Sequence, residues 1–187
     1  MKKLLKILSA IIAAGSYAYM ICAIIRGTGE GLLISTFALW SILAWITTVS
    51  MLGKVERSAL IVPCIYATGA TTTSIILVFK GRYGFSGLDG LTTSLATFCI
   101  VALIGNEKTK ALVLSVAAGM IAAVPFIALT WQRPEHSPII PNAGCLAANI
   151  LGLMAIPNRK IESWLFYVAN IMLGIALVLP WLLMFVW

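Results

Sequence analysis

Seven apolar stretches, each long enough to cross a lipid bilayer as a helix, follow one another along almost the whole sequence. A helix needs about 17–25 mostly apolar residues to span the hydrocarbon core. The segments between the stretches are short and carry nearly all of the charge. Because the bilayer interior offers no water to unpaired backbone groups, apolar spans of this kind form helices. We therefore expect seven transmembrane helices, at residues 7–25, 31–52, 59–79, 88–104, 111–131, 139–156 and 164–185.

The composition favours an all-α integral membrane protein in contact with bilayer lipid. Of the 187 residues, 61% are hydrophobic and 10% are charged, whereas a soluble domain is about half apolar and about a quarter charged. The net charge of +7 does not indicate a nucleic-acid partner, because bases in a membrane protein collect in its cytoplasmic loops. The four cysteines lie in apolar stretches without CxxC spacing, and His136 has no nucleophile beside it. We expect no metal site, no cofactor and no enzyme activity.

The N-terminal segment has two interpretations. Its basic head, apolar run and small residues up to Ala18 are also the pattern of a signal peptide. The apolar run continues past Ala18 to Ile25, however, which is the length of a full span. We interpret the segment as a retained first helix.

Basic residues divide unequally between the two sides of the expected bundle. Nine fall on the side of the N-terminus and four on the other side, which predicts a cytoplasmic N-terminus and an external C-terminus. The expected location is the bacterial cytoplasmic membrane. The nine are Lys2, Lys3, Lys6, Lys54, Arg57, Lys108, Lys110, Arg159 and Lys160, and the four are Arg26, Lys80, Arg82 and Arg133.

A short pattern recurs 106 residues along the chain, as "KVERSALIVPCI" from Lys54 and "KIESWLFYVANI" from Lys160. The order, spacing and sidedness of the spans agree with it, so that spans one to three match spans five to seven. Two apolar helices that each follow a basic loop would also look alike without a repeat, and this alternative stays open. If the repeat holds, the unmatched fourth span restores the parallel sense of the two units. We then expect two parallel three-helix bundles, at residues 1–80 and 107–187, joined by a linker loop and helix at 81–106.

This plan of three, one and three helices resembles the SWEET sugar transporters and the PnuC nicotinamide-riboside transporters of the PQ-loop superfamily. The segment "RKIESW" at residues 159–164 is similar to the start of the last helix in PnuC-type proteins. A PQ-loop relative has Pro-Gln in the first helix of a repeat, whereas here Pro125 precedes Phe126. The resemblance implies a uniporter-like facilitator that carries a nucleoside-like vitamin precursor or a sugar by alternating access. It leaves assembly into a homo-oligomer open.

Two amides lie deep in the expected spans, where an asparagine is costly unless it finds hydrogen-bond partners. They are Asn149 in the sixth span and Asn170 in the seventh, and Asn170 shares a helix face with Tyr167 and Gly174. Polar residues inside spans are candidate functional residues. In SWEET-like proteins an asparagine in the third helix of a repeat contacts the substrate, and the resemblance gives Asn170 that role. The alternative is a helix–helix hydrogen bond.

Aromatic side chains also lie too deep to be interfacial anchors. Trp40 and Trp45 stand well inside the second span, Tyr66 inside the third, and Tyr17 and Tyr19 inside the first. Together with Tyr167 they would offer flat faces to a sugar or a heteroaromatic ring. Close packing between helices is the alternative for each of them.

Two further features bear on mechanism. Pro125, deep in the fifth span, must break one helical hydrogen bond, and we expect a hinge there, with a static kink as the alternative. No charged residue stands in mid-span, which favours facilitated diffusion over ion-driven pumping. The rival hypothesis is a non-transporting scaffold or accessory subunit of the same fold. In that case Trp40, Tyr66 and Asn170 would pack against neighbouring helices around a closed apolar space.

Overall fold

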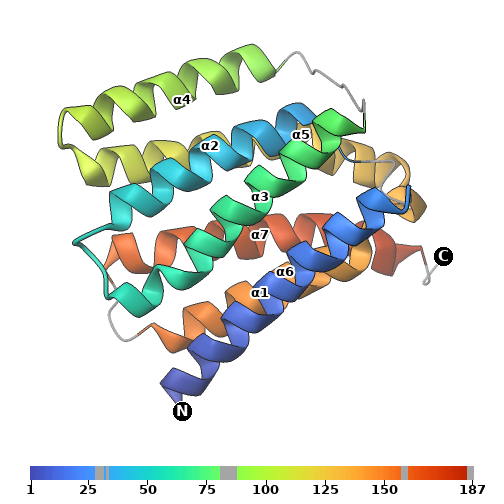
Figure 1. The fold of residues 1–187 in the computed structure, drawn as a ribbon, viewed down its shortest axis with the longest axis horizontal. Helices are drawn as coiled ribbons and strands as arrows, with labels where there is room; N and C mark the ends of the chain where they lie inside the picture. Colours follow the sequence, from blue (N-terminus) through green and yellow to red (C-terminus); the bar gives the residue numbers. More distant parts are fainter. Residues whose placement is uncertain (28–31, 33, 81–87, 157–159, 185–187) are drawn as a thin grey trace.

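The computed structural model describes residues 1–27, 32, 34–80, 88–156 and 160–184, and all of its secondary structure within these ranges is helical (Figure 1). Arg82 and Arg159, two of the basic residues counted above, lie outside the described residues. The α-helices are α1 (Lys2–Ile25), α2 (Ile34–Met51), α3 (Ile61–Phe79), α4 (Asp89–Ile104), α5 (Lys108–Gln132), α6 (Ile139–Ala155) and α7 (Ile161–Leu183). Two short 3-10 helices, η1 (Arg57–Ala59) and η2 (Pro134–His136), precede α3 and α6.

One helix falls on each expected span. Five helical segments are long and apolar enough to cross a bilayer, namely α1, α2, α5, α7 and the stretch Arg57–Phe79 that contains α3. The other two, α4 and α6, are shorter apolar helices of 16 and 17 residues. A helix of about 17 residues is at the lower limit for spanning the hydrocarbon core. The prediction of an all-α integral membrane protein is confirmed at this level.

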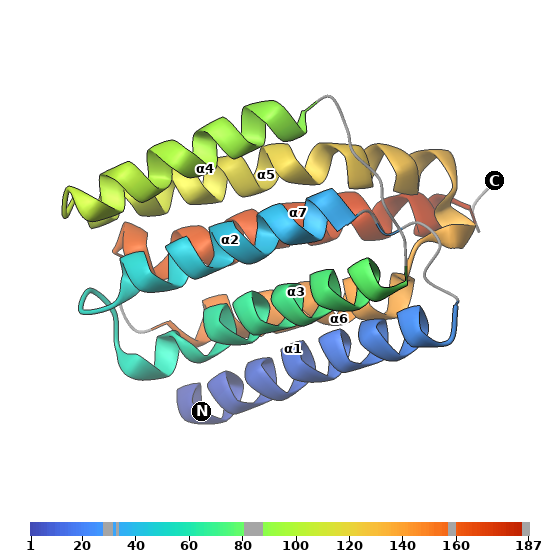
Figure 2. The same cartoon turned by 45° about the horizontal axis from the view of Figure 1, so that its top comes forward.

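The helices run side by side, and each contacts a small set of neighbours (Figures 1 and 2). We call α1, α2, η1 and α3 the first half, and α5, η2, α6 and α7 the second half. Within the first half α3 contacts both α1 and α2, and within the second half α7 contacts both α5 and α6. Across the halves α1 packs on α6 and α2 on α5, while α4 lies outside against α5 and α2.

The odd-numbered long helices α1, α3, α5 and α7 begin at the same end of the bundle (Figure 2). An ion pair between Lys6 of α1 and Glu56, just before η1, marks this end, with Nζ and Oε2 2.9 Å apart. We call it the Lys54 end. At the opposite end, which we call the Lys80 end, Lys80 Nζ donates to the Ile25 carbonyl oxygen at 3.1 Å and joins the ends of α3 and α1.

Glycines allow two pairs of helices inside the halves to approach closely. A methyl group at Gly69 of α3 would overlap the ring of Tyr17 on α1, and one at Gly152 of α6 would overlap the ring of Tyr167 on α7. Small residues at helix interfaces are the usual means of close packing in membranes, where helix association depends on van der Waals contact. These two contacts fix the depth at which the two tyrosine rings lie.

Candidate functional site

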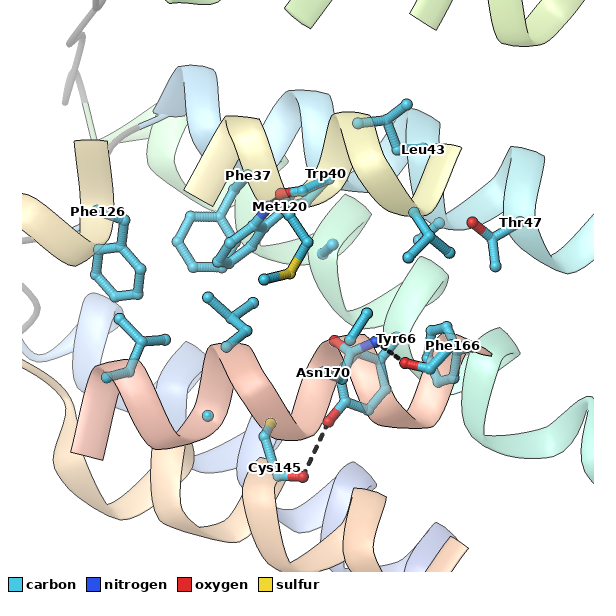
Figure 3. Close-up of a pocket in the computed structure, with 18 of the residues that line it drawn as sticks. Phe37, Trp40, Leu43, Thr47, Tyr66, Met120, Phe126, Cys145, Phe166 and Asn170 are labelled. Carbon is cyan, nitrogen blue, oxygen red and sulfur yellow. Dashed lines mark hydrogen bonds between the residues drawn. The ribbon is translucent and has the colours of Figure 1, made fainter. Parts of the chain in front are cut away.

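A cavity of about 120 Å³ lies between the two halves, and residues of every α-helix except α4 line it (Figure 3). A single water molecule needs roughly 10–15 Å³ of such space. The cavity is therefore several times larger than a water site. Its lining is mainly apolar and aromatic, and none of the described lining residues is charged.

Three aromatic rings form one wall of the cavity. Phe37 and Trp40 of α2 meet Phe126 of α5 in edge-to-face geometry, with ring centroids 6.2 Å apart for Phe37–Phe126 and 6.0 Å apart for Trp40–Phe126. We call this group the Trp40 cluster. The indole Nε1 of Trp40 donates to the Gly119 carbonyl oxygen of α5 at 3.0 Å, so the N–H is satisfied while the ring faces the cavity. The cluster joins the first half to the second.

A second aromatic group lies on the side of the cavity nearer the Lys54 end. Tyr66 of α3 packs edge-to-face against Tyr17 of α1 and Phe166 of α7, with centroids 5.4 Å and 5.5 Å apart. We call it the Tyr66 cluster. Figure 3 shows Tyr66 and Phe166 at the opposite end of the cavity from Phe126. Since edge-to-face pairs are favourable beyond their buried area, each cluster holds helices of both halves together.

Asn170 supplies the amide that faces the cavity between these two clusters (Figure 3). Its Nδ2 donates to the Phe166 carbonyl oxygen, one turn earlier in α7, at 2.8 Å. Its Oδ1 makes no hydrogen bond with the part of the chain that the structure describes. The hydrogen bond at Nδ2 fixes the orientation of the half-buried amide. Its Oδ1 can then accept a hydrogen bond from an N–H or O–H group of a solute.

Asn149 is not part of the lining but lies behind Tyr66. Its Nδ2 donates to the Cys145 carbonyl oxygen at 2.7 Å and also to the Tyr66 hydroxyl, which in turn donates to the same carbonyl at 3.2 Å. Asn149 is 1% exposed, and its Oδ1 has no partner in the described structure. The geometry makes Asn149 a residue that positions Tyr66, whereas Tyr66 itself lines the cavity.

Two of the aromatic candidates point away from the cavity. Trp45 is 42% exposed on the outer surface of the bundle, and its Nε1 donates to the Thr71 hydroxyl of α3 at 3.2 Å. Tyr167 is buried against Gly152, and its hydroxyl donates to the Ala59 carbonyl oxygen at 3.3 Å. The structure thus brings Trp40, Tyr66 and Asn170 together and leaves Trp45 and Tyr167 elsewhere.

Pro125 lies inside α5, directly before the cavity residue Phe126. Because proline removes a backbone donor from the helix, α5 has one hydrogen bond fewer at the level of the Trp40 cluster. A change of the helix angle at Pro125 would move Phe126 against Trp40. The hinge stays a prediction.

Of the two deep tyrosines in the first helix, Tyr17 lines the cavity and Tyr19 does not. Phe37 and Phe126 also line the cavity, although the sequence did not indicate them as site residues. Phe37 stands three residues before Trp40, and this spacing places two aromatic rings on one face of a helix. That signal was available in the sequence. Phe126 carries no comparable signal, since its role depends on contacts between distant segments.

The polar side chains that line the cavity are uncharged amides and hydroxyls. Thr47 of α2 and Ser115 of α5 both line it and share a hydrogen bond of 2.8 Å between their hydroxyls. Charged side chains lie toward the ends of the bundle instead. At the Lys54 end the hydrogen bond from Lys6, and then its charge, lower the pKa of Glu56. Within the described residues no group of three or more His, Cys, Asp or Glu side chains could hold a metal ion.

Comparison of the chain with protein-family models, with curated proteins and with solved structures finds no match.

Proposed function

We propose that this protein is a membrane facilitator, which carries a small, polar, uncharged solute by alternating access of its two halves. The observation that carries the proposal is the cavity in mid-bundle, shared by six helices of both halves and furnished with the free carbonyl oxygen of Asn170. Ligand sites in helical membrane proteins lie between helices near the midplane, where the two halves meet. The solute classes we propose are nucleoside-like vitamin precursors and sugars.

The chemistry of the lining supports an uncharged solute. No charged side chain stands among the described lining residues, and an unpaired charge in such a site would keep its full desolvation cost. A neutral solute could place a ring against Trp40 or Tyr66 and donate one hydrogen bond to Asn170 Oδ1. The described lining residues include no Asp, Glu, Lys, Arg or His. This also fits facilitated diffusion, since coupling to an ion or a proton usually uses such a residue.

The neighbours of the helices support two equivalent three-helix bundles with α4 as the linker. If α1, α2 and α3 are exchanged for α5, α6 and α7, each contact within one half becomes a contact within the other. The same exchange turns the packing of α1 on α6 into the packing of α5 on α2. This is the pattern expected of parallel repeats related by an axis along the membrane normal.

The acids near the beginnings of α3 and α7 follow the same exchange. Glu56 is bonded by Lys6 of α1, the first helix of its own half. Glu162 accepts a hydrogen bond of 3.0 Å from Thr109 of α5, the first helix of the second half, to which Glu162 itself belongs. Each acid therefore contacts the beginning of the first helix in its own unit, which supports the repeat that begins at Lys54 and at Lys160.

We further propose that the Lys54 end faces the cytoplasm of a bacterial cell. Lys6, Lys54 and Lys108 all make contacts at this end, and basic residues are enriched on the cytoplasmic side of membrane proteins. An alkaline phosphatase fused after residue 184 should be active, whereas the same reporter in the turn at Gly53 should be inactive. The opposite pair of results would reverse the assignment.

Uptake into proteoliposomes tests the function. Neutral nucleosides, vitamin precursors and sugars should be compared with charged nucleotides, using the wild type, Asn170→Ala and Trp40→Ala. Trp45→Ala is the matched control, because the Trp45 indole lies outside the cavity. We expect at least one neutral solute to cross faster than through empty liposomes, with slower transport by the two cavity variants only. If no solute does so, the result favours the non-transporting scaffold.

A further inference from the structure

Side chains from the two halves meet at the Lys54 end through a charged contact. Lys54 Nζ lies 3.6 Å from Glu162 Oε1, and it also donates to the Thr109 hydroxyl. Thr109 in turn donates to Glu162 Oε1 at 3.0 Å. The three residues come from the loop after α2, from the beginning of α5 and from the beginning of α7. One triangle of polar contacts therefore connects the first half to two helices of the second.

The position of Lys54 is set by a tight turn at the end of α2. Gly53 has a φ of 78°, a backbone conformation that glycine adopts without strain. The Lys54 N–H then donates to the Met51 carbonyl oxygen at 3.0 Å. The Lys54 and Glu162 side chains are 32% and 18% exposed, so the pair is partly withdrawn from water. Screening by salt is weaker for such a pair than for a fully exposed one.

Two more hydrogen bonds cross between the halves at this end. Lys108 Nζ of α5 donates to the Leu52 carbonyl oxygen at 3.2 Å. The Tyr167 hydroxyl of α7 donates to the Ala59 carbonyl oxygen of η1 at 3.3 Å. Both acceptors lie in the segment between α2 and α3, which also holds Lys54. This segment of the first half is thus bonded to α5 and to α7.

Two hydrogen bonds between described residues at the Lys80 end each stay within one half. Lys80 joins α3 to α1 within the first half, and the Trp131 indole donates to the Ala176 carbonyl oxygen at 3.1 Å, which joins α5 to α7 within the second half. These two bonds can persist while the halves move relative to each other. Those of Lys54 and Tyr167 cannot persist if the halves separate at the Lys54 end.

We infer that Lys54, Thr109 and Glu162 form a latch, which holds the two halves together and closes the cavity on this side of the membrane. The inference rests on the proposed function, because only a transporter has to open the cavity to each side in turn. The Tyr66 cluster and the Thr47–Ser115 pair lie between the latch and the middle of the cavity. Opening the latch is then the first step of solute release toward the Lys54 side.

Cys145 is a built-in reporter of that opening, since it is half-buried and lines the cavity. The other three cysteines, Cys22, Cys64 and Cys99, are replaced by serine or alanine. A membrane-impermeant methanethiosulfonate is then added to vesicles from the Lys54 side only, and the rate of Cys145 modification is measured. Vesicles of both orientations are needed, and the reporter fusions described above establish which is which.

Glu162→Gln and Lys54→Met each remove the ion pair of the latch. We expect both variants to raise the rate of Cys145 modification from the Lys54 side by about two- to fivefold, the effect typical of one partly exposed ion pair. The charge-swapped double variant, Lys54→Glu with Glu162→Lys, should restore the wild-type rate. The restored rate would also exclude a general loosening of the fold as the cause.

Glu56→Gln and Glu107→Gln are the matched controls. The first removes the Lys6–Glu56 pair inside the first half, and the second removes the Lys110–Glu107 pair at the beginning of α5. Neither pair crosses between the halves, so neither variant should change the rate. A rate that stays at the wild-type value in Glu162→Gln and Lys54→Met, or that rises equally in the controls, would overturn the latch.

The test of the latch can be separated from the test of the proposed function. Solute uptake is measured in the same vesicles as Cys145 modification, and the two measurements are independent. Faster labelling in the latch variants supports an opening at the Lys54 end whether or not a tested solute crosses. Absence of uptake in the wild type, with labelling that responds as expected, would count against the solute classes proposed and not against the latch.

Discussion

The hydroxyl of Tyr66 on α3 receives a hydrogen bond from Asn149 on α6, and it donates to the carbonyl oxygen of Cys145 at 3.2 Å. The phenol of the first half is thereby fixed to one helix of the second half by two contacts on the same helix face. Its ring forms part of the cavity wall. Asn149, which the sequence suggests as a ligand-binding residue, stands outside the cavity lining and bonds the hydroxyl of an aromatic residue that belongs to it.

Replacing Asn149 by alanine should therefore reduce stability. The substitution removes the bonds to Tyr66 and to Cys145 from a side chain that is 1% exposed. Hydrogen bonds between membrane helices contribute about 0.6 kcal/mol on average and up to about 1.7 kcal/mol. We expect a lower midpoint of thermal unfolding in detergent. Asn142→Ala, which removes a contact to Ser137 in the same helical region, is the control, and an equal loss there would contradict the special role of Asn149.

Close helix packing gives a second prediction. Gly69→Ala should lower the thermal midpoint, because the new methyl group overlaps the Tyr17 ring, and overpacking costs about 1–3 kcal/mol. Gly15→Ala is the matched control, since a methyl group at Gly15 meets no atom within 4 Å. In that control helix propensity alone acts, and it favours alanine by up to about 1 kcal/mol. Equal destabilisation by the two substitutions would contradict the packing argument.

The number and order of the helices follow from hydrophobicity alone. Which side chains of each helix point toward the cavity does not. Trp40 and Trp45 are five residues apart, which rotates them about 140° around the helix axis. One faces the cavity and the other the outer surface. An apolar helix offers little contrast between its faces in the sequence, because lipid and protein interior both accept apolar side chains. Which tryptophan faces inward is decided by the neighbours α3 and α5.

Asn170 and Tyr167 also show that the sequence does not determine which side chains of an apolar helix face the cavity. They are three residues apart on α7 and were expected to share one face. The structure turns Asn170 toward the cavity, whereas Tyr167 reaches Gly152 and Ala59. A rotation of about 60° separates the two directions. Such a difference depends on where α6 and η1 lie, and their positions depend on contacts between segments that are far apart in the sequence.

The ion pair of Lys6 and Glu56 predicts a dependence of stability on pH. The hydrogen bond from Lys6 and the charge of Lys6 lower the pKa of Glu56 in the folded state. The contribution of the pair is therefore fully present above the unfolded pKa of glutamate, about 4.3, and it is lost as the pH falls through the lower folded value. The wild type should unfold at higher temperature than Glu56→Gln near pH 7, and the two curves should converge below pH ~4. If the difference in unfolding temperature between the two proteins is the same at all pH values, the ion pair is not the cause of that difference.

The sharpest prediction for the cavity concerns Asn170. Asn170→Ala removes the carbonyl oxygen that faces the cavity, and a hydrogen bond between uncharged groups contributes about 0.5–1.5 kcal/mol. We expect a two- to tenfold higher half-saturation concentration for the solute, which is about the factor that this free energy corresponds to.

Asn170→Asp keeps an oxygen at the position and adds a charge. The charged form of this carboxyl is costly in the apolar lining, so uptake by this variant should fall as the pH rises and the carboxyl ionises. The described lining residues of the wild type include no carboxyl group, so its uptake should stay level over the same range. If the aspartate variant is also independent of pH, Asn170 does not contact the solute.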